Sequence, residues 1–497
     1  MKKIISLLLC LAMLLPALAG CSETNPEDDA ASENPAAESE TAPVEEEEPE
    51  VSRANMPDNL PADLDFGGQT FGQFSQTESK VEEFYRGPEE LTGEVVADAV
   101  YQRNVKVADR LNIAFNFVST SGDFVSDVKN LVMSGDTSYD YFTGNQYQIT
   151  PIITSNCFLN SFDAPYLDYD QPWWNTVYMD ELALGSGFRY FLVGDYALDA
   201  VAQERVVFYN KNLYGQLYGD PDGLYQNAIE GTWTIDLMTD LAEGAYIDTD
   251  GNGQTDETDM LGFITYATYS SVDAFVYGSD VKFSSRDENG YVVLELMSDR
   301  ALLLLDKLNR LFHNQCSFYN TDGRNVAQFA TGTALFLGNA TFLHAKELRE
   351  MEDDYGYLPY PKLDESQTEY RSLVHDTVDI GAVSICCNKL ELAYAALEAL
   401  TAETYRTVTP AYYETALKSK YARDEISQQM IDVVHDAMTT SFVFAYNYAI
   451  SNAGLLFRDL VTNNSNDYAS AVKRSEKAAN KLLSKIVEHF TNEEAGE

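Results

Sequence analysis

The sequence predicts an α/β fold whose sheets are doubly wound and largely parallel. Two observations predict it. Stretches with the 3.6-residue spacing of amphipathic helices alternate with short apolar runs, so that residues 66–142 are ordered strand, helix, strand, helix, strand. Roughly 435 residues follow an N-terminal segment of different composition, which is enough for two or three domains with large cores.

The elements of the first half follow from their residue patterns. In residues 95–111, Val100, Val107 and Leu111 recur near one face, which is the pattern of an amphipathic helix, and Gly135 ends the next helix. The predicted order is a turn into a strand at 66–71, a helix at 95–111, a strand at 113–118, a helix at 124–133 and a strand starting at 139–142. Such β-α-β units place successive strands parallel.

The second half continues the alternation less regularly. The predicted order is a strand running into a helix at 205–211, a helix start at 231–236 capped by Thr232 or Thr234, a strand and polar turn at 332–339, a short strand broken by prolines at 355–361, and a buried strand at 380–385. Each segment alone is unspecific, and only their order supports the α/β prediction.

The first 21 residues have the pattern of an export signal. Lys2 and Lys3 precede an apolar run at residues 4–15, which is too short to span a bilayer core of about 30 Å. Leu18-Ala19-Gly20-Cys21 then resembles a bacterial lipobox, in which the cysteine carries acyl chains such as palmitate. The alternative is an ordinary cleaved signal with a chance cysteine.

An acidic tether is predicted at residues 22–60. Residues 22–51 contain no aromatic and no basic residue, and four consecutive glutamates stand at 45–48. Such a segment cannot bury enough apolar surface to offset its ordering entropy, so we expect it to be disordered. We therefore expect the protein on the extracellular face of a bacterial membrane, held there by a lipid anchor.

The charge balance excludes several partners. The formal net charge is −46, from 79 acidic and 33 basic residues. This argues against nucleic acid, anionic headgroups and polyphosphates as partners, and is compatible with neutral solutes, with cations, or with a role in solubility alone. Cys157, Cys316, Cys386 and Cys387 lack zinc-site spacing. They are interpreted as buried thiols, with a Cys157–Cys316 disulfide as the alternative.

The order of elements resembles the sugar-type (family 1) extracellular solute-binding proteins of ABC importers, in a clostridial-type lipoprotein branch. The matching segments are the lipobox and tether, residues 99–104 leading into 111–113, residues 172–175, 208–213, 232–234, 332–339 and 358–362. Each motif is short and degenerate, and together they cover nearly the whole body.

The resemblance implies a two-lobe, periplasmic-binding-protein-like fold in which crossover strands form a hinge. The implied lobes are residues 61–195 plus 375–422, and residues 196–374 plus 423–497, with the C-terminal helices packed mainly on the second lobe. It also implies a monomer that delivers a small solute, most readily a carbohydrate, to ABC permease subunits. A glycan-active enzyme and a sensing lipoprotein without transport are the alternatives.

The candidate ligand contacts combine strand ends, aromatic platforms and the implied crossovers. Asn145 and Gln146 follow a strand at its carboxyl end, where open α/β sheets bind ligands. At most one of the adjacent tryptophans is expected to face a cleft. The full candidate set is Asn145, Gln146, Trp173, Trp174, Asp195, Tyr196, Asn339, Thr341, His375, Asp376 and Tyr446.

Residues 248–259 have the spacing of an EF-hand calcium loop. Oxygen ligands stand at positions 1, 3, 5, 9 and 12, glycine stands at position 6, and position 7 offers its backbone carbonyl. The predicted ligands are Asp248, Asp250, Asn252, Gln254, Asp256 and Asp259. Asp259 replaces the usual glutamate, as in dockerin-like loops. The alternative is an acidic Asn-Gly turn, and a bound ion is expected to be structural.

The sequence does not favour catalysis. It has five histidines and no H-x-x-x-H pair, no G-x-S-x-G elbow and no phosphate-binding loop. Ser470 and Lys473 match a serine–lysine spacing without the partner motifs. A glycosidase pair among the many acids cannot be tested by pattern, so we expect a binding protein without catalytic residues.

Overall fold

The structure is a computed structural model that describes residues 52–266, 270–320, 322–417 and 425–494. The chain divides into residues 1–50 and a compact unit of residues 51–497. The predicted signal segment, Cys21 and most of the tether lie outside the described residues. Among the described helices, none combines the length and apolar character needed to cross a membrane.

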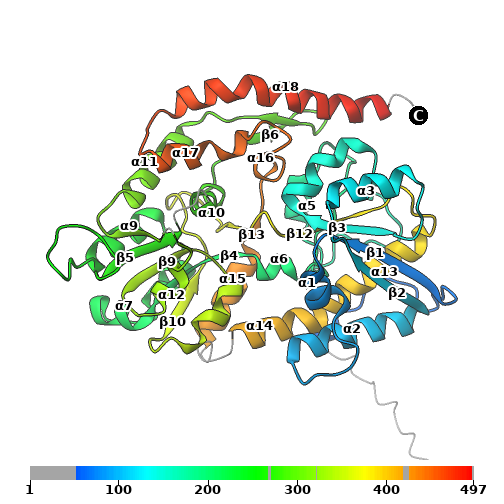
Figure 1. Cartoon of the computed structure of the whole chain (residues 1–497), viewed down its shortest axis with the longest axis horizontal. Coiled ribbons are helices and arrows are strands. Elements are labelled where there is room, and N and C mark those ends of the chain that lie inside the picture. The colour runs from blue at the N-terminus through cyan, green and yellow to red at the C-terminus, as the bar shows by residue number, and fades with distance from the viewer. Residues whose placement is uncertain (1–51, 267–269, 321, 418–424, 495–497) are drawn as a thin grey trace, which may run out of the picture. The chain divides into compact units, whose positions relative to one another are not determined.

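The first lobe is built on a four-stranded sheet with the order β12-β3-β1-β2. The strands are β1 (Gln69–Ser75), β2 (Ile113–Ser119), β3 (Tyr141–Asn145) and β12 (Asp379–Val383). β1 pairs in parallel with β2 and with β3, whereas β12 is antiparallel to β3. The crossover helices are α2 (Val95–Leu111) and α3 (Phe124–Met133), at the predicted bounds. Figure 1 shows this sheet at the right.

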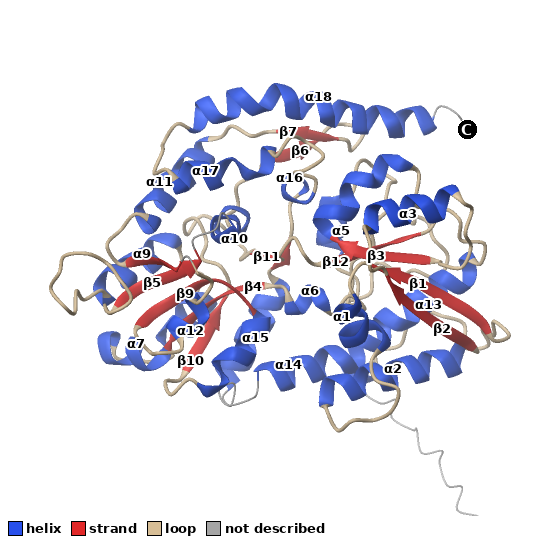
Figure 2. Cartoon of the chain, in the orientation of Figure 1, coloured by secondary structure: helices blue, strands red, loops and turns tan. Residues whose placement is uncertain are grey.

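The second lobe has a five-stranded sheet with the order β10-β4-β9-β5-β8. Its strands are β4 (Arg205–Asn210), β5 (Leu261–Tyr266), β8 (Ser317–Asn320), β9 (Ala334–Thr341) and β10 (Tyr355–Leu358). β5 is parallel to β8 and β9, but β4 is antiparallel to β9, so this sheet is mixed. Helices flank both sheets (Figure 2), which confirms the α/β class.

Helix starts in the second lobe follow the capping rules. The Thr234 hydroxyl accepts a hydrogen bond from the Leu237 amide and begins α9 (Ile235–Ala245), as one of the two predicted caps. The Asn210 side chain likewise caps α7 (Lys211–Tyr218), and Ser298 caps α11 (Asp299–Phe312).

The other elements are shorter. In the first half they are η1 (Arg53–Asn55), α1 (Glu78–Lys80), η2 (Val81–Arg86), α4 (Gln146–Ile149), η3 (Thr150–Ser155), α5 (Thr176–Leu182), α6 (Asp199–Ala202) and α8 (Gly223–Ile229). Then come α10 (Ser270–Gly278), β6 (Ser284–Arg286), β7 (Val292–Leu294), α12 (Asn325–Phe329), η4 (Phe342–Glu350), β11 (Ser372–Leu373), α13 (Leu390–Glu403), η5 (Thr404–Val408), α14 (Thr409–Leu417), α15 (Glu425–Asp436), β13 (Met438–Thr439), α16 (Phe442–Ala445), η6 (Ala453–Leu455), α17 (Leu456–Thr462) and α18 (Tyr468–Glu494).

Crossover segments join the two sheets. The first runs through α6 into β4, the second leads from β11 to β12, and the two are bridged where Glu204 pairs with Val374. A further connection runs from α14 to α15, and β13 returns to pair in parallel with β11.

The end of the predicted tether is a correction. Residues 52–60 are ordered and pack on the first lobe. The Asp58 carboxylate accepts hydrogen bonds from Arg110 and Arg406 at 2.7 Å each, and Leu60 is buried. Burial raises the pKa of Asp58, but the bonds and charges of the two arginines outweigh it and lower that pKa to about 2. Composition hid these contacts because their partners lie far along the chain.

The placement of the C-terminal segment is also corrected. α15 contacts α8 and β10 of the second lobe, as expected. However, α16 packs on α5 of the first lobe, and Phe490 of α18 lies against Phe188 and Tyr190 of that lobe. The reason is that α18 is 27 residues long and reaches both lobes.

The four described cysteines are free, as the thiol interpretation predicted. Burial raises the pKa of the Cys316 thiol to about 11 and that of Cys387 to about 12, so neither is a reactive thiolate at neutral pH.

Candidate functional site

The carboxyl ends of the parallel strands bring polar side chains to one edge of each sheet. In the first lobe this edge is the end of β3 at Asn145, which pairs in register with Asp379 at the start of antiparallel β12. In the second lobe it is the end of β9 at Thr341, which pairs with Arg205 at the start of antiparallel β4. Ligands bind at such edges in open α/β sheets.

Lys80 connects the first lobe to both crossovers. Its ammonium donates hydrogen bonds to Asp199 of α6 (2.7 Å), Asp379 (2.9 Å) and Asn145 (3.1 Å), and to the Thr377 carbonyl. Desolvation by burial lowers the pKa of Lys80, but the two carboxylates outweigh it and the pKa is raised. Asn145, a predicted contact, is therefore held by Lys80 at the entrance to the hinge.

Arg205 provides a buried positive charge at the edge of the second lobe. It is 2% exposed, donates to the Asn339 side chain, and has no hydrogen-bond partner at Nε among the described residues. The Asn339 carbonyl oxygen also accepts from the Ser270 hydroxyl at 3.4 Å. Asn339 has φ = 53°, a left-handed conformation that asparagine tolerates better than most residues. It was predicted from the sequence, whereas Arg205 was not.

The second crossover adds an acceptor beside these donors. The His375 Nδ1 lies 3.1 Å from the Asp376 carboxylate, and both side chains are partly exposed, at 30% and 20%. Burial raises the pKa of Asp376, but the His375 hydrogen bond and the charges of Arg205 and Arg458 outweigh it and lower that pKa. Asp376 therefore stays ionised at neutral pH and accepts hydrogen bonds.

Two tyrosines supply an aromatic surface near the same edge. Tyr147, which follows Asn145 by two residues, lies with its ring centroid 5.9 Å from that of Tyr448, and Tyr448 is 52% exposed. The sequence analysis chose Tyr446 instead. Tyr446 is fully buried, donates to the Leu182 carbonyl and stacks on Phe442, because it belongs to the turn that closes α16.

We define the strand-end site as Lys80, Asn145, Arg205, Asn339, His375 and Asp376. It joins residues of both lobes and both crossovers, and it offers donors, acceptors and a neighbouring aromatic surface. Lys80 and Arg205 were missed because a lone lysine after a strand, or an arginine that starts one, carries no sequence signal.

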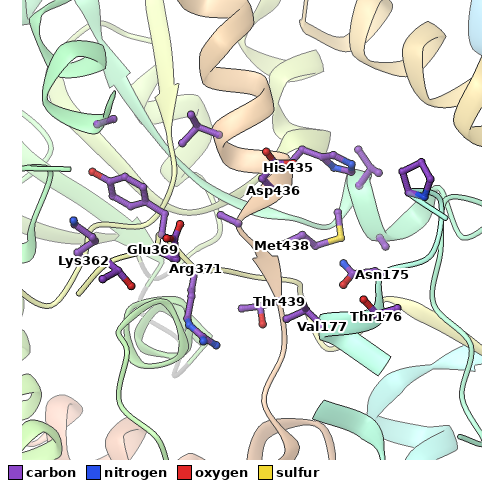
Figure 3. Close-up of a pocket in the computed structure, with 18 of the residues that line it drawn as sticks. Asn175, Thr176, Val177, Lys362, Glu369, Arg371, His435, Asp436, Met438 and Thr439 are labelled. Carbon is purple, nitrogen blue, oxygen red and sulfur yellow. The ribbon is translucent and has the colours of Figure 1, made fainter. Parts of the chain in front are cut away.

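A second concave region lies between the lobes. A pocket of about 1030 Å³ is lined by Asn175 and Thr176 of the first lobe, Lys362 and Arg371 of the second, and Thr439 of β13. Figure 3 shows Asn175 and Thr176 on one side of β13 and Lys362, Glu369 and Arg371 on the other. None of the residues of the strand-end site lines it. Its lining carries both signs of charge. We call it the hinge pocket.

Two predicted contacts belong to the hinge pocket rather than to the strand-end site. Trp174 and Asp195 both line it. The Asp195 carboxylate accepts a hydrogen bond from the Thr409 hydroxyl at 2.7 Å, and Arg53 lies 3.5 Å away. Desolvation by burial raises the pKa of Asp195 to about 6, against the lowering effects of Thr409 and Arg53.

The adjacent tryptophans share one buried acceptor. The indole of Trp173 donates to Glu398 at 3.0 Å, and that of Trp174 donates to the other oxygen of the same carboxylate at 2.8 Å. Burial raises the pKa of Glu398 to about 7, against these bonds. Trp173 is fully buried, so at most Trp174 faces a pocket, as predicted.

Five predicted contacts are corrected because they are buried among protein partners. The Gln146 side-chain carbonyl accepts from Tyr178 (2.6 Å), Tyr196 donates to Gln73 (2.6 Å), and the Thr341 amide donates to His344 (3.0 Å). The residues removed from the candidate set are Gln146, Trp173, Tyr196, Thr341 and Tyr446. Each is within a few positions of an exposed residue, and strand and helix orientation, not sequence, decides which one is accessible.

The acidic loop between α9 and β5 brings three carboxylates together. One oxygen from each of Asp248, Asp250 and Asp259 lies within 4.8 Å of the others. Asp259 is 1% exposed, and its two oxygens accept from the amides of Thr249 (2.9 Å) and Asp256 (3.0 Å). In the described part of the chain, no lysine or arginine pairs with these three aspartates. Uncompensated, converging carboxylates fit a divalent cation.

Comparison with known proteins identifies the fold. No protein-family model matches the chain, and no curated protein matches its sequence. Solved structures do match. The cyclic α-maltosyl-1,6-maltose-binding protein from Arthrobacter globiformis is 14% identical, with 84% of this chain and 100% of that chain covered and a TM-score of 0.56. A cyclo/maltodextrin-binding protein in complex with maltotetraose is 12% identical (84% and 97% covered, TM-score 0.54).

A third match is the galacto-N-biose/lacto-N-biose I-binding protein of the ABC transporter from Bifidobacterium longum, in complex with lacto-N-biose. It is 13% identical, with 84% and 98% covered and a TM-score of 0.53. The chain has the two-lobe fold of periplasmic binding proteins. At this level of identity the likeness shows the fold alone.

Proposed function

We propose that the protein captures a small carbohydrate at the strand-end site and delivers it to an ABC permease. The observation that carries the proposal is the meeting of Asn145 from one lobe, Arg205 and Asn339 from the other, and Asp376 from a crossover. Sugars need both donors and acceptors around their hydroxyls and an aromatic surface for their apolar faces. Arg205 donates, Asp376 accepts, and Tyr448 is an exposed ring beside them.

The neighbouring structures support a saccharide as the solute. The compared proteins are described as binding maltosyl-maltose, maltodextrin or lacto-N-biose. They are binding proteins, and no pair of groups in the strand-end site suggests a reaction. The proposal therefore excludes catalysis and leaves the individual sugar to experiment.

The proposed location follows from the N-terminal sequence. Cleavage after Gly20 and acylation of Cys21 would leave the body on an acidic tether at the outer face of the membrane, as in the clostridial-type lipoprotein branch that the sequence resembles. Replacing Cys21 with alanine then releases a folded protein from washed membranes. Retention of the C21A protein on those membranes contradicts the anchor.

The binding proposal is tested by a ligand screen followed by calorimetry. A thermal-shift screen with mono- and oligosaccharides, amino acids and peptides identifies a solute, because binding to the native state raises the apparent stability. Asn339→Ala and Arg205→Gln are then expected to weaken binding at least about tenfold, since each hydrogen bond to a buried hydroxyl is worth roughly 1–3 kcal/mol. The melting curves of both variants without solute serve as the folding control.

A matched pair of variants separates the two concave regions. Lys362→Gln and Asp195→Asn alter the hinge pocket and leave the strand-end site untouched, so we expect unchanged affinity. If these two variants lose binding and Asn339→Ala does not, the solute site is the hinge pocket. If only amino acids or peptides bind, the carbohydrate assignment is wrong while the binding role stands.

We also propose that the loop at residues 248–259 holds a structural Ca²⁺. Asp248, Asp250 and Asp259 would supply carboxylate oxygens, with Asn252, Asp256 and the Gln254 carbonyl completing the set. The loop joins the end of α9 to the start of β5, where Ile247 and Met260 pair. A cation there would neutralise three clustered charges and fix this connection.

The calcium proposal predicts a reversible stability change. EDTA is expected to lower the melting temperature and Ca²⁺ to restore it, with no response in a variant carrying Asp248→Ala and Asp250→Ala. Glu257→Gln lies in the same loop but outside the ligand positions, so it should keep the response. Identical melting curves in EDTA and Ca²⁺ for the unmodified protein contradict the site.

A further inference from the structure

One corner of the first lobe receives three elements that lie away from the crossovers. The corner is residues 180–190, which begin at the end of α5 (Thr176–Leu182). The elements are the β6–β7 hairpin, the turn after α16, and the C-terminal end of α18. Neither crossover, at residues 196–204 and 374–379, contributes to these contacts, so they form a separate connection between the lobes.

The hairpin belongs to the second lobe in sequence and packing. Phe283, directly before β6, lies 5.7 Å from Tyr277 of α10 and 5.9 Å from Phe457 of α17, measured between ring centroids. At its other end Arg286 donates to the carbonyls of Asp180 (2.6 Å) and Ala183.

The tip of the hairpin continues this contact. The Ser186 amide donates to the Asn289 carbonyl at 3.4 Å, and a Cβ on Gly290 would lie only 2.1 Å from the Ser186 Oγ. The two chains therefore approach as closely as glycine permits.

Helix α18 spans the same two bodies. Its 27 residues measure roughly 40 Å at 1.5 Å per residue. At the start, Tyr468 is fully buried, donates to the Leu296 carbonyl and lies 5.1 Å from the Phe457 ring, which places this end on the second lobe. Figure 1 shows the helix passing above both sheets.

The far end of α18 is anchored on the corner. Phe490 is 1% exposed and lies 5.5 Å from Phe188 and 5.3 Å from Tyr190, between ring centroids. His489 Nε2 lies 2.8 Å from the Asn156 side-chain oxygen, also in the first lobe. Phe188 in turn meets Tyr291 of the hairpin at 6.5 Å, so hairpin and helix converge on one ring.

We propose that α18 and the β6–β7 hairpin form a strap that limits rotation of the two lobes about the crossovers. A hinge needs only the crossovers to connect its lobes, and any packed contact away from the axis must slide or break when the lobes rotate. Because Phe490 and Arg286 both hold the corner, releasing them frees the rotation while leaving each sheet intact. The strap thereby sets how readily the proposed solute site opens.

The test uses hydrogen exchange of the full chain, without any solute. The variant carries Phe490→Ala and Arg286→Ala. Exchange is expected to rise about tenfold or more at residues 183–190 and also at the crossovers, 196–204 and 374–379, because local opening governs amide exchange. Strands β1 and β9 should keep the exchange of the unmodified protein. Lys485→Ala, an exposed position on the same helix, is the matched control and should change nothing.

Other outcomes overturn the strap. If exchange rises only at residues 183–190 and the crossovers are unchanged, the contacts are local packing without influence on the hinge. If the double variant unfolds globally, α18 is part of a single core rather than a strap. Phe490→Leu, which keeps an apolar contact, should restore slow exchange at the crossovers, and failure of that restoration also contradicts the proposal.

Discussion

Removing Lys80 should be among the most destabilising single changes on the surface of the hinge. Its ammonium lies 2.7 Å from Asp199 and 2.9 Å from Asp379, whose side chains are 1% and 0% exposed. At an effective dielectric constant of 20, each pair attracts by roughly 6 kcal/mol, and the desolvation of three charged groups offsets much of this. Losing one partner of a buried ion pair typically costs about 3–5 kcal/mol, because the remaining charge is left uncompensated. We therefore expect Lys80→Met to lower the free energy of unfolding by about 3–5 kcal/mol near pH 8.

The penalty should depend on pH in a defined direction. Burial raises the pKa of Asp379 even in the presence of Lys80, so the folded protein prefers this group protonated. Stability from such a group is present at low pH and is lost as the pH rises through the folded pKa. Without Lys80 the pKa values of Asp379 and Asp199 rise further. The penalty of Lys80→Met is therefore smaller at pH 5 than at pH 8.

Urea unfolding at both pH values measures this prediction. Lys346→Met is the matched control, because Lys346 is 50% exposed and pairs with the equally exposed Glu83, a contact worth about 1 kcal/mol or less. Asp379→Asn in the Lys80→Met background should recover part of the loss, which a double-mutant cycle quantifies. If Lys80→Met costs no more than Lys346→Met at either pH, the reasoning about this buried triad is wrong.

Three further predictions concern other sites. Asp195→Asn should stabilise the protein by at most about 3 kcal/mol at pH 8 and by nothing at pH 4, because the pKa of Asp195 is raised to about 6 and the ionised form costs stability as the pH rises; equal melting shifts at both pH values would refute this. Gly262→Ala should be strongly destabilising, since its Cβ would lie 2.0 Å from the Ala242 carbonyl oxygen, whereas Gly215→Ala in α7, with 3.4 Å to its nearest neighbour, should stabilise by about 0.5–1 kcal/mol; chemical unfolding compares the two, and a tolerated Gly262→Ala contradicts the helix–strand contact. Cys316 and Cys387, with raised pKa values of about 11 and 12, should react with a thiol reagent only on unfolding, and fast labelling of the native protein at pH 7 would show that these thiols are accessible.

The sequence carried the local structure of the first lobe well. Periodic apolar residues in 95–111 and 124–133 predicted α2 and α3 at their observed bounds, because amphipathic spacing and capping are local properties. The second sheet was predicted less completely. Nothing in residues 205–210 indicates that β4 runs antiparallel to β9, since strand direction depends on which strand it meets.

The candidate site divides in the same way. Asn145 and Asn339 were predictable because they follow strands at carboxyl ends, and the calcium loop was predictable because its ligands are consecutive in sequence. Tyr446 was chosen over Tyr448 because the turn after α16, which buries one ring and exposes the other, leaves no sequence signal. Arg205 was missed because its environment is formed by segments more than 130 residues away, such as Asn339.

The sequence by itself determined the α/β class, the acidic character, the export-type N-terminus and the spacing of the calcium loop, all of which depend on residues close together in the chain. Tertiary structure alone decided which residues share a site. Lys80 meets Asp199 and Asp379 only after the two crossovers come together, and Phe490 reaches Phe188 only because α18 spans both lobes. Such contacts depend on chain closure over hundreds of residues, and short-range patterns do not encode the geometry of that closure.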